Sequence, residues 1–331
     1  MLTPPSRAAY HPIAMRQSAA AFPPYDLLTQ RAVHDTETKM VRLERIYHVA
    51  QRNAWQGHEV LRALIAKHGP PSVSADKKQA IARIFTIILW GELAAWIVSA
   101  DLAERLTDVE AKMAATSQAF DEARHFYVMR EYLLALGVTL PPLDGYTQAV
   151  LRELLAEESL TRKLIGMQLI VENVALGLFR EVARAQVEPV LAELMPYYER
   201  DEARHVGLGV LYLPKRLAEL PKRKLLGIRD LTWGIGDLFG ATQVRYAPHY
   251  AALGADPREL IRAADKMLYE LSQKIGPIPG TDLEFFPTNP TQSASYEDAL
   301  DLVLPRPGAE RRPLGRLLRA AIEYGARVLP V

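Results

Sequence analysis

The chain has 331 residues, enough for two domains or one large helical domain. Its 40 Lys and Arg residues nearly balance its 39 Asp and Glu residues, which argues against nucleic-acid binding because such proteins usually carry a clear basic excess. There is no cysteine, so the composition excludes disulfides, iron–sulfur clusters, thiolate metal sites and a cysteine nucleophile. Any bound metal must therefore be held by His, Asp or Glu.

The N-terminal segment is rich in proline and lacks the apolar core of a signal peptide. We expect an irregular arm over residues 1–35 and a cytoplasmic protein. The longest apolar run, residues 84–100, carries Glu92 in its middle and is shorter than the roughly 20 residues of a typical membrane span. It is predicted to be a buried core helix, and no membrane span is expected.

Apolar residues recur at three- and four-residue steps along most of the chain, which is typical of amphipathic helices. This periodicity predicts helices over residues 38–68, 75–106, 108–136, 146–157, 159–186, 189–213, 221–246, 256–275 and 311–328. Thr107 and Glu110 form a capping-box pattern before the third helix, and Pro214 should end the sixth. Residues 276–295 are predicted to be a loop.

No stretch alternates between apolar and polar residues as a half-buried strand would, so the predicted fold is all-α. Four of the helices are long enough to pack side by side around a continuous core. We predict a four-helix bundle core with additional N- and C-terminal helices. The bundle should occupy residues 36–220, and a helical extension over residues 221–331 should pack on it.

The pentapeptide Asp-Glu-Ala-Arg-His occurs twice, at residues 121–125 and 201–205. A glutamate precedes each motif glutamate at the same interval: Glu92 precedes Glu122, and Glu172 precedes Glu202. The flanking residues share little identity. The pattern is consistent with an old duplication of a two-helix unit that kept its chemical positions.

This spacing has a physical explanation. Residues i and i+3 lie on one helix face, so Glu122 and His125 can hold one cation together, and the second motif can do the same. The interval between the two glutamates matches a run along one helix, round a tight turn and back, which places each upstream glutamate opposite its motif. Four carboxylates buried alone would repel one another, and two divalent cations remove that cost. We predict six metal ligands for iron or manganese: Glu92, Glu122, His125, Glu172, Glu202 and His205.

The alternative is that these residues are surface charges on amphipathic helices. Apolar residues surround both Glu92 and Glu172 in the sequence, which argues against a solvated face. The pattern resembles the ferritin-like di-metal carboxylate superfamily, in which two helices each supply a Glu and two others each supply Glu-x-x-His. The Asp-Glu-x-Arg-His form is similar to bacterial multicomponent monooxygenases and the ribonucleotide reductase small subunit, and the resemblance covers about residues 85–210.

The resemblance implies a ferritin-like fold and an enzyme with two Fe ions, or a mixed Mn/Fe pair, that uses O2. It further implies a small organic substrate and an external electron donor, such as a ferredoxin or a reductase, and we expect a homodimer. It also implies that each motif aspartate orients the histidine of the opposite motif, with a motif arginine neutralising it. The implied residues are Asp121 with His205, Asp201 with His125, and the arginines Arg124 and Arg204. The alternative for each Asp and Arg is an ordinary helix-surface ion pair.

Two aromatic residues, Trp55 and Tyr198, are candidates for a function near the predicted metal ligands. Trp55 lies upstream of Glu92 on the leading helix, near where the ribonucleotide reductase small subunit keeps an electron-relay Trp; the alternative is a core Trp. Tyr198 is a candidate for a redox or hydrogen-bonding residue near the metals, and Glu199 for a spare carboxylate.

A basic stretch over residues 215–229 is either a solvated face or a docking surface for an acidic electron donor.

The sequence departs from the best-known branches of the superfamily. Met129 stands where the ribonucleotide reductase small subunit has its radical tyrosine, and Met167 where ligand-binding oxidases have a cross-linking tyrosine. Ala175 and Leu176 stand where monooxygenases and desaturases have a threonine, and Tyr198 where arylamine N-oxygenases have an extra His ligand. The branch is therefore not identified.

Residues one helical turn from the ligands are expected to line a substrate pocket. They are Leu89, Trp96, Gln118, Met129, Gln168, Leu169, Leu176, Phe179, Met195, Tyr198 and Gly209. Three functions stay open: an O2-activating oxidase or oxygenase, a radical-generating subunit, and an iron-storage or peroxide-scavenging protein. The length favours the first, because the chain is much longer than the four-helix core that storage or scavenging needs.

Overall fold

The computed structural model describes residues 40–280, 289–306, 308–310 and 312–328, and the arm expected at residues 1–35 lies outside them. Within the described ranges the chain forms twelve α-helices, one π-helical segment and one 3₁₀ turn, and no strand. The all-α prediction is confirmed.

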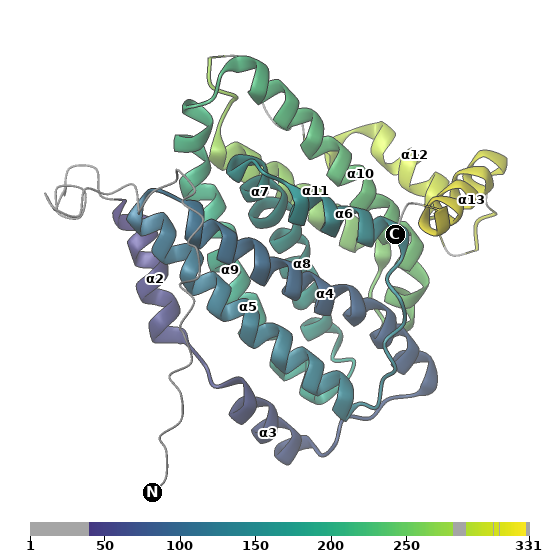
Figure 1. Ribbon diagram of the computed structural model, residues 1–331. Coiled ribbons are helices and arrows are strands. Elements are labelled where there is room, and N and C mark those ends of the chain that lie inside the picture. The colour runs from purple at the N-terminus through teal and green to yellow at the C-terminus, as the bar shows by residue number, and fades with distance from the viewer. Residues whose placement is uncertain (1–39, 281–288, 307, 311, 329–331) are drawn as a thin grey trace, which may run out of the picture. The chain divides into compact units, whose positions relative to one another are not determined.

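Four long helical rods form the central bundle (Figure 1). They are α4 (Ala75–Arg105), α5 (Val109–Ala135), α8 (Glu172–Ala185) with the π segment η1 (Ile165–Val171) leading into it, and α9 (Pro189–Ala218). Helix α4 pairs with α5, α8 pairs with α9, and α5 packs against α9. Two helical hairpins therefore face each other, as the repeated spacing predicts.

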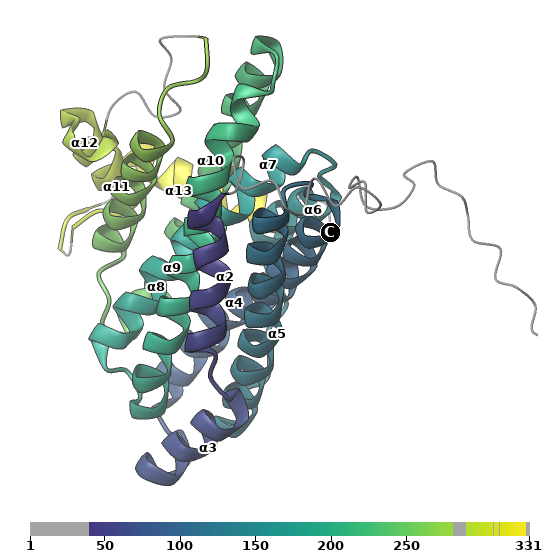
Figure 2. The same cartoon turned by 90° about the vertical axis from the view of Figure 1, so that its left-hand side faces the viewer.

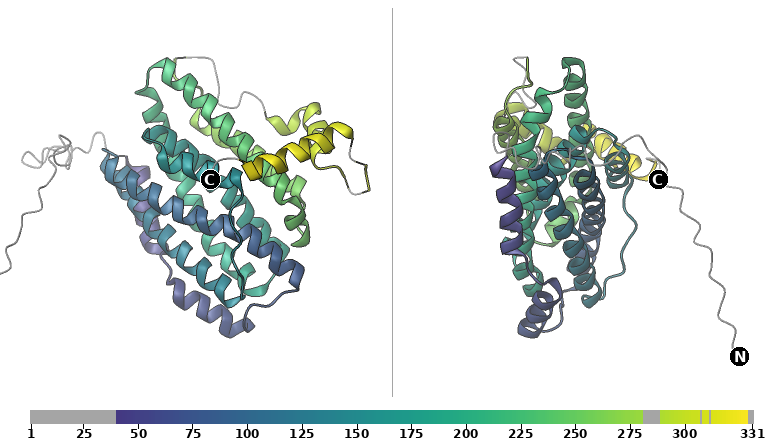
Figure 3. Two further views of the ribbon diagram at one scale, coloured as in Figure 1. Left: turned by 45° about the vertical axis from the view of Figure 1, so that its right-hand side comes forward. Right: turned by 60° about the vertical axis from the view of Figure 1, so that its left-hand side comes forward.

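The remaining helices cover the bundle. Figure 2 shows α2 (Val41–Asn53), in purple, lying along α5 and α9, and α3 (Gly57–His68) also contacts these two helices. Helices α6 (Gly145–Ala156) and α10 (Lys222–Ala252) pack on α4, and α11 (Pro257–Ile275) packs on α8 and α9. The other elements are α7 (Leu160–Leu164), η2 (Pro290–Gln292), α12 (Ala294–Val303) and α13 (Pro313–Val328). Helices α12 and α13, in yellow in Figure 3, contact each other.

The bundle core consists of two apolar clusters. One cluster contains Leu89, Met129, Phe179 and Tyr198. The other, on the opposite side of the predicted ligands, contains Ala95, Ala115, Ile170 and Leu208. Along every rod the predicted ligands lie between the two clusters. Burial of this much apolar surface on both sides stabilises the bundle independently of the charged layer.

The expected helix over residues 38–68 is wrong, because the structure has two helices separated by Ala54, Trp55 and Gln56. The break turns the Trp55 side chain inward, where it is 8% exposed. Gly57 begins α3 in close contact with α5: a Cβ atom there would lie 2.4 Å from Cγ2 of Val128. Tertiary packing thus overrides the helical periodicity of this segment.

Three further expectations about elements are wrong. The Thr107–Glu110 capping box does not form: the N-cap of α5 is Asp108, whose carboxylate instead accepts hydrogen bonds from Tyr212 and Lys215. Helix α9 continues past Pro214 to Ala218, since these contacts and other buried side chains hold its last turns. Helix α12 is not expected from the sequence, and its first residues fall in the predicted loop.

Helix α4 is long and apolar enough to cross a membrane by length and composition alone. However, 61% of its most apolar window is buried inside the protein, and Glu92 lies within the helix. It is a core helix of the bundle, as predicted, and not a membrane span.

Candidate metal centre

The structure brings all six predicted ligands together in the middle of the bundle. One group joins Glu92, Glu122, His125 and Glu202, and the other joins Glu122, Glu172, Glu202 and His205. In each group one ligand atom per residue lies within 4.8 Å of all the others, and every side chain is buried. We call these the Glu92 position and the Glu172 position. Glu122 and Glu202 belong to both, so two ions held here would share them.

The nitrogen and oxygen atoms of the predicted ligands lie close together, but several of them form no well-aligned hydrogen bond. Nδ1 of His125 lies 3.0–3.3 Å from carboxylate oxygens of Glu92, Glu122 and Glu202. Yet Nδ1 of His125, Oε2 of Glu122 and Oε1 of Glu202 have no well-formed hydrogen bond and are buried. Buried unpaired polar atoms are rare and call for an explanation. Carboxylate oxygens and imidazole nitrogens converging in this way fit divalent iron or manganese.

The protonation pattern of the metal-free cluster points the same way. Burial raises the pKa of Glu92, as do the charges of Glu202 and Glu122. Burial and neighbouring carboxylates also raise the pKa of Glu172. Burial lowers the pKa of His125 and His205, but the surrounding carboxylates outweigh it and raise both pKa values well above the ordinary value. Burial raises the pKa of Glu122, but the two histidines outweigh it and hold that pKa well below the ordinary value. Cations bound here would therefore displace protons from the groups whose pKa is raised.

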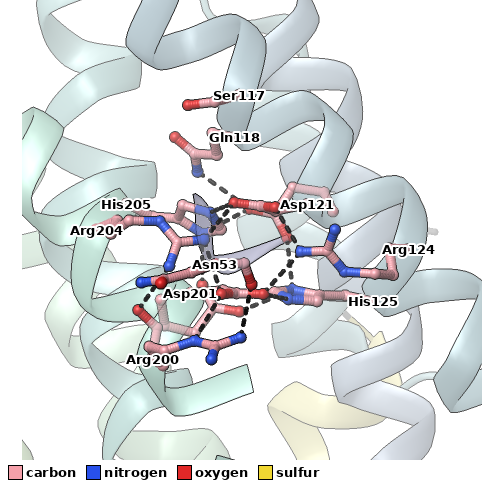
Figure 4. Close-up of polar contacts among 12 residues, drawn as sticks. Asn53, Ser117, Gln118, Asp121, Arg124, His125, Arg200, Asp201, Arg204 and His205 are labelled. Carbon is pink, nitrogen blue, oxygen red and sulfur yellow. Dashed lines mark hydrogen bonds and ion pairs between the residues drawn. The ribbon is translucent and has the colours of Figure 1, made fainter. Parts of the chain in front are cut away.

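The two motif aspartates lie where the resemblance implies. Oδ2 of Asp121 is 3.3 Å from Nε2 of His205, and Oδ2 of Asp201 is 3.2 Å from Nε2 of His125 (Figure 4). Each imidazole thus turns Nε2 toward an aspartate of the opposite hairpin and Nδ1 toward the carboxylate cluster. A carboxylate in this place fixes the ring orientation and the tautomer of a metal-bound histidine.

Both motif arginines bind both aspartates. Arg124 donates to Asp121 at 2.5 Å and to Asp201 at 2.8 Å. Arg204 donates to Asp121 at 2.8 Å and to Asp201 at 2.7 Å (Figure 4). All four side chains are buried, so this is not a pair of solvated surface salt bridges. Burial raises the pKa of Asp201, but the hydrogen bond and charge of His125 and then the charge of Arg204 outweigh it, so that the pKa is lowered.

Trp55 joins this network on one side only. Its indole Nε1 donates to Oδ2 of Asp201 at 2.7 Å, and the guanidinium of Arg124 lies 4.8 Å from the ring centroid. A chain of contacts therefore runs from Trp55 through Asp201 to His125. The residue is more than a space-filling core tryptophan.

Tyr198 and Glu199 differ in their placement. Tyr198 stacks on the His125 ring with centroids 4.4 Å apart, and its hydroxyl donates to the backbone oxygen of His125 at 2.7 Å. Burial raises its pKa well above the ordinary value. Glu199 instead pairs with Arg180 at 2.7 Å on the half-exposed side of the bundle. The idea of Glu199 as a spare carboxylate at the metals is wrong.

A cavity of about 60 Å³ opens beside the ligands, and Glu92 and Glu172 form part of its wall. Most of the wall is apolar and comes from α4, α8, α6 and α10, with Thr147, Thr242, Gln243 and Tyr250 as polar groups. None of the eleven residues predicted to line a pocket belongs to this wall. That prediction considered the bundle helices alone, whereas α6 and α10 close the cavity from outside. One available signal was the small residue three positions after each upstream glutamate, Ala95 and Ala175.

Gln118 and Gln168 form a hydrogen-bonded pair at the ligands, a role that the sequence did not reveal. Nε2 of Gln118 donates to Glu172 at 2.6 Å and to Glu122 at 3.1 Å. Gln168 donates to Oε1 of Gln118 at 3.1 Å. Gln118 lies one helical turn before Glu122, on the same helix face, and this spacing was the available signal.

The arrangement of the helices is similar to that of known proteins. An R2-like ligand-binding oxidase with an aerobically reconstituted Mn/Fe cofactor superposes with a TM-score of 0.59 and 20% identity, over 74% of this chain and 96% of that one. A variant of that oxidase with an Fe/Fe cofactor gives 0.57 and 18%, over 71% and 93%. The fold is ferritin-like.

A third similar structure is a protein from Synechococcus with aldehyde deformylating oxidase activity, at a TM-score of 0.51 and 18% identity, over 61% of this chain and 92% of that one. No protein-family model and no curated protein matches the chain. The ferritin-like bundle is thus established from the structure, and the chemistry has to be argued from the carboxylate–histidine centre.

Proposed function

We propose that this protein is a di-metal oxidase or oxygenase that uses O2 to oxidise a small, mainly apolar organic substrate. The observation that carries the proposal is the cavity: its apolar wall ends on Glu92 and Glu172, which belong to the two metal positions. Pockets for small molecules are typically apolar with a few polar groups, as here. A pair of Fe ions, or Mn and Fe, would supply the binding and reduction of O2.

The chain's own residues do the rest of the work. Glu122 and Glu202, shared by both positions, hold the two ions together, while Asp121 and Asp201 orient the imidazoles. The apolar wall excludes water from the ligand layer, which protects reactive species from side reactions. Trp55, bonded to Asp201, is a route by which an external donor delivers electrons to the centre.

The test uses the purified protein loaded anaerobically with Fe(II) and mixed with O2. We expect rapid O2 consumption, and oxidised product with a member of a panel of small apolar aldehydes, amines and hydrocarbons. Ala175→Leu fills the cavity one helical turn from Glu172, so it should abolish product formation and leave metal content unchanged. The control is Arg180→Leu on the exposed side of the same helix, where turnover should persist. Absence of O2 uptake by the metal-loaded wild type would overturn the proposal.

One observation favours a second function, that of a radical-generating subunit. Trp55 and Tyr198 both lie against His125 and are redox-active residue types. Electron paramagnetic resonance after O2 exposure would detect a persistent tyrosyl or tryptophanyl radical if this function holds. Iron storage or peroxide scavenging gives the cavity no role. The homodimer, the identity of the electron donor and the cytoplasmic location stay predictions.

A further inference from the structure

The two halves of the repeat differ in what surrounds their ligands. The sequence offset that relates Glu92 to Glu172 also relates Gln118 to Tyr198. Gln118 bonds ligand carboxylates, whereas the one partner of the Tyr198 hydroxyl among the described residues is the backbone of His125. One metal position therefore has a side-chain amide beside its carboxylates where the other has an aromatic ring.

At the Glu172 position the side-chain amide of Gln118 uses all its hydrogen-bonding groups. The Nε2 group of Gln118 donates to one oxygen each of Glu172 and Glu122, and its Oε1 accepts from Gln168. Gln118 and Gln168 are 1% and 0% exposed, so water does not compete for these bonds. Because both amide hydrogens and the amide oxygen are used, Gln118 has a single orientation, and it fixes the Glu172 carboxylate.

Gln168 fits only because of the residue facing it. A Cβ atom at Gly209 would lie 2.8 Å from Cβ of Gln168, so α9 carries a glycine where Gln168 enters the bundle. In the other half, the residues at the same offset are Ile88 for Gln168 and Met129 for Gly209. Three positions of the repeat thus differ together: two amides and a glycine on one side, and three large apolar or aromatic residues on the other.

Glu92 has a different environment. In the described residues, its side chain makes one polar contact of ordinary length, with Nδ1 of His125 at 3.3 Å, and no amide reaches it. Both Glu92 and Glu172 border the cavity, so the difference between them lies in the amide that bonds Glu172 and not Glu92. The carboxylate of Glu92 can therefore change its orientation, whereas that of Glu172 is held.

We propose that the Gln118–Gln168 pair makes the two metal positions unequal. The Glu172 position binds its ion more tightly, because before the metal arrives Gln118 orients Glu172 as well as the shared Glu122, whereas at the Glu92 position it orients only the shared Glu122. The Glu92 position binds more weakly and is the one whose carboxylate moves when a ligand enters the cavity. This inference rests on the proposed di-metal function, and it makes Gln118 a positioning residue.

The test is a titration of the metal-free protein with Mn(II), in which the electron paramagnetic resonance signal of free Mn(II) reports binding. The wild type should bind two ions in unequal steps. Glu172→Gln should remove the tighter step, and Glu92→Gln the weaker one. Gln118→Leu keeps the volume but removes the donors, so it should weaken the tighter step by about 10–100-fold, the usual size of such indirect effects on metal sites.

Gln51→Leu is the matched control, because it makes the same substitution at an exposed amide on α2 that bonds Tyr47 instead of a predicted ligand, and both its binding steps should stay as in the wild type. Circular dichroism and thermal melting establish that each variant is folded. Two equal steps in the wild type, unchanged steps in Gln118→Leu, an equal loss in Gln51→Leu, or loss of the tighter step in Glu92→Gln would each overturn the inference. A wild type that binds fewer than two Mn(II) ions would overturn the proposed function itself.

Discussion

Asp201 has more donors than its repeat counterpart. Both aspartates accept from Arg124, Arg204 and a histidine of the opposite hairpin, but among the described residues only Asp201 also accepts from an indole, that of Trp55. Such charge-assisted bonds are about twice as strong as neutral ones. Asp201 therefore links the outer helices to the His125 side of the centre.

Replacing Asp201 tests this role. Asp201→Asn keeps the shape but removes the charge that orients His125, so we expect metal affinity to fall by about 10–100-fold while helicity is retained. Metal content after dialysis against a graded series of chelator concentrations measures the change. Glu199→Gln, which alters a half-exposed ion pair on the same helix, is the control and should bind metal normally. Equal affinity in Asp201→Asn and wild type would contradict the orienting role.

Trp55 offers a second test. Trp55→Phe removes the donor to a buried carboxylate and should lower the free energy of unfolding by about 1.5–3 kcal/mol, the range for hydrogen bonds to charged groups. Urea unfolding of the metal-free protein measures it. Trp96→Phe, at a side chain that is 39% exposed, should change stability by less than about 0.5 kcal/mol. Similar losses in the two variants would show that the bond to Asp201 contributes nothing specific.

The candidate ligands could be predicted from the sequence because helical geometry converts spacing into position. A Glu-x-x-His pair on one face and a glutamate one helix earlier at matching height must meet if the two helices form a hairpin. The spacing places Gln118 and Gln168 near the ligands, but the bond between them could not be predicted, since they belong to different hairpins and meet only when these pack together. The roles of the six residues as metal ligands stay predictions until metal is measured.

At the scale of elements, η1 and α9 approach closely where Gly209 faces Gln168. Gly209→Ala places a methyl group into this contact and should destabilise the protein by about 1–3 kcal/mol, the usual cost of overpacking. Gly177→Ala on α8 is the matched control: no atom lies within 4 Å of the added Cβ, so the change should stabilise the helix by about 0.5–1 kcal/mol. Chemical denaturation measures both, and a neutral or stabilising Gly209→Ala would show that the contact relaxes freely.

Element boundaries were predicted well where periodicity and stop signals agree, as for α4, α5 and α11. They failed where distant contacts decide the local structure. The bond from Trp55 to Asp201 accompanies the break between α2 and α3, and the bond from Tyr212 to Asp108 helps α9 continue past Pro214. The residues that line the cavity were predicted wrongly for the same reason, because α6 and α10, which form part of its wall, are remote in sequence from the bundle helices that they cover.

At the scale of the molecule, a charged layer lies between two apolar clusters that pack without it. Removing the metals should therefore leave the far-ultraviolet circular dichroism nearly unchanged but lower the melting temperature. Ions that bind only the folded chain stabilise it, by about 4 kcal/mol at a free concentration about 1,000 times the dissociation constant. Scanning calorimetry with and without chelator measures the shift.

Glu202→Ala provides the control for metal removal, because Glu202 belongs to both positions. This variant should contain little metal, keep its helicity and melt at a temperature that chelator does not change. A chelated wild type that loses its helices, or a Glu202→Ala variant that still responds to chelator, would contradict the layered arrangement.

Each metal position takes three ligands from one hairpin and one from the other, since Glu202 joins the first group and Glu122 the second. Neither hairpin alone can complete a position, so the order of events during folding is constrained. The two hairpins must dock before either ion gains its full set of ligands, and an ion once bound ties together segments that are far apart in the chain. If the centre binds metal as proposed, metal loading would be a late step that closes a long loop between the two halves of the bundle.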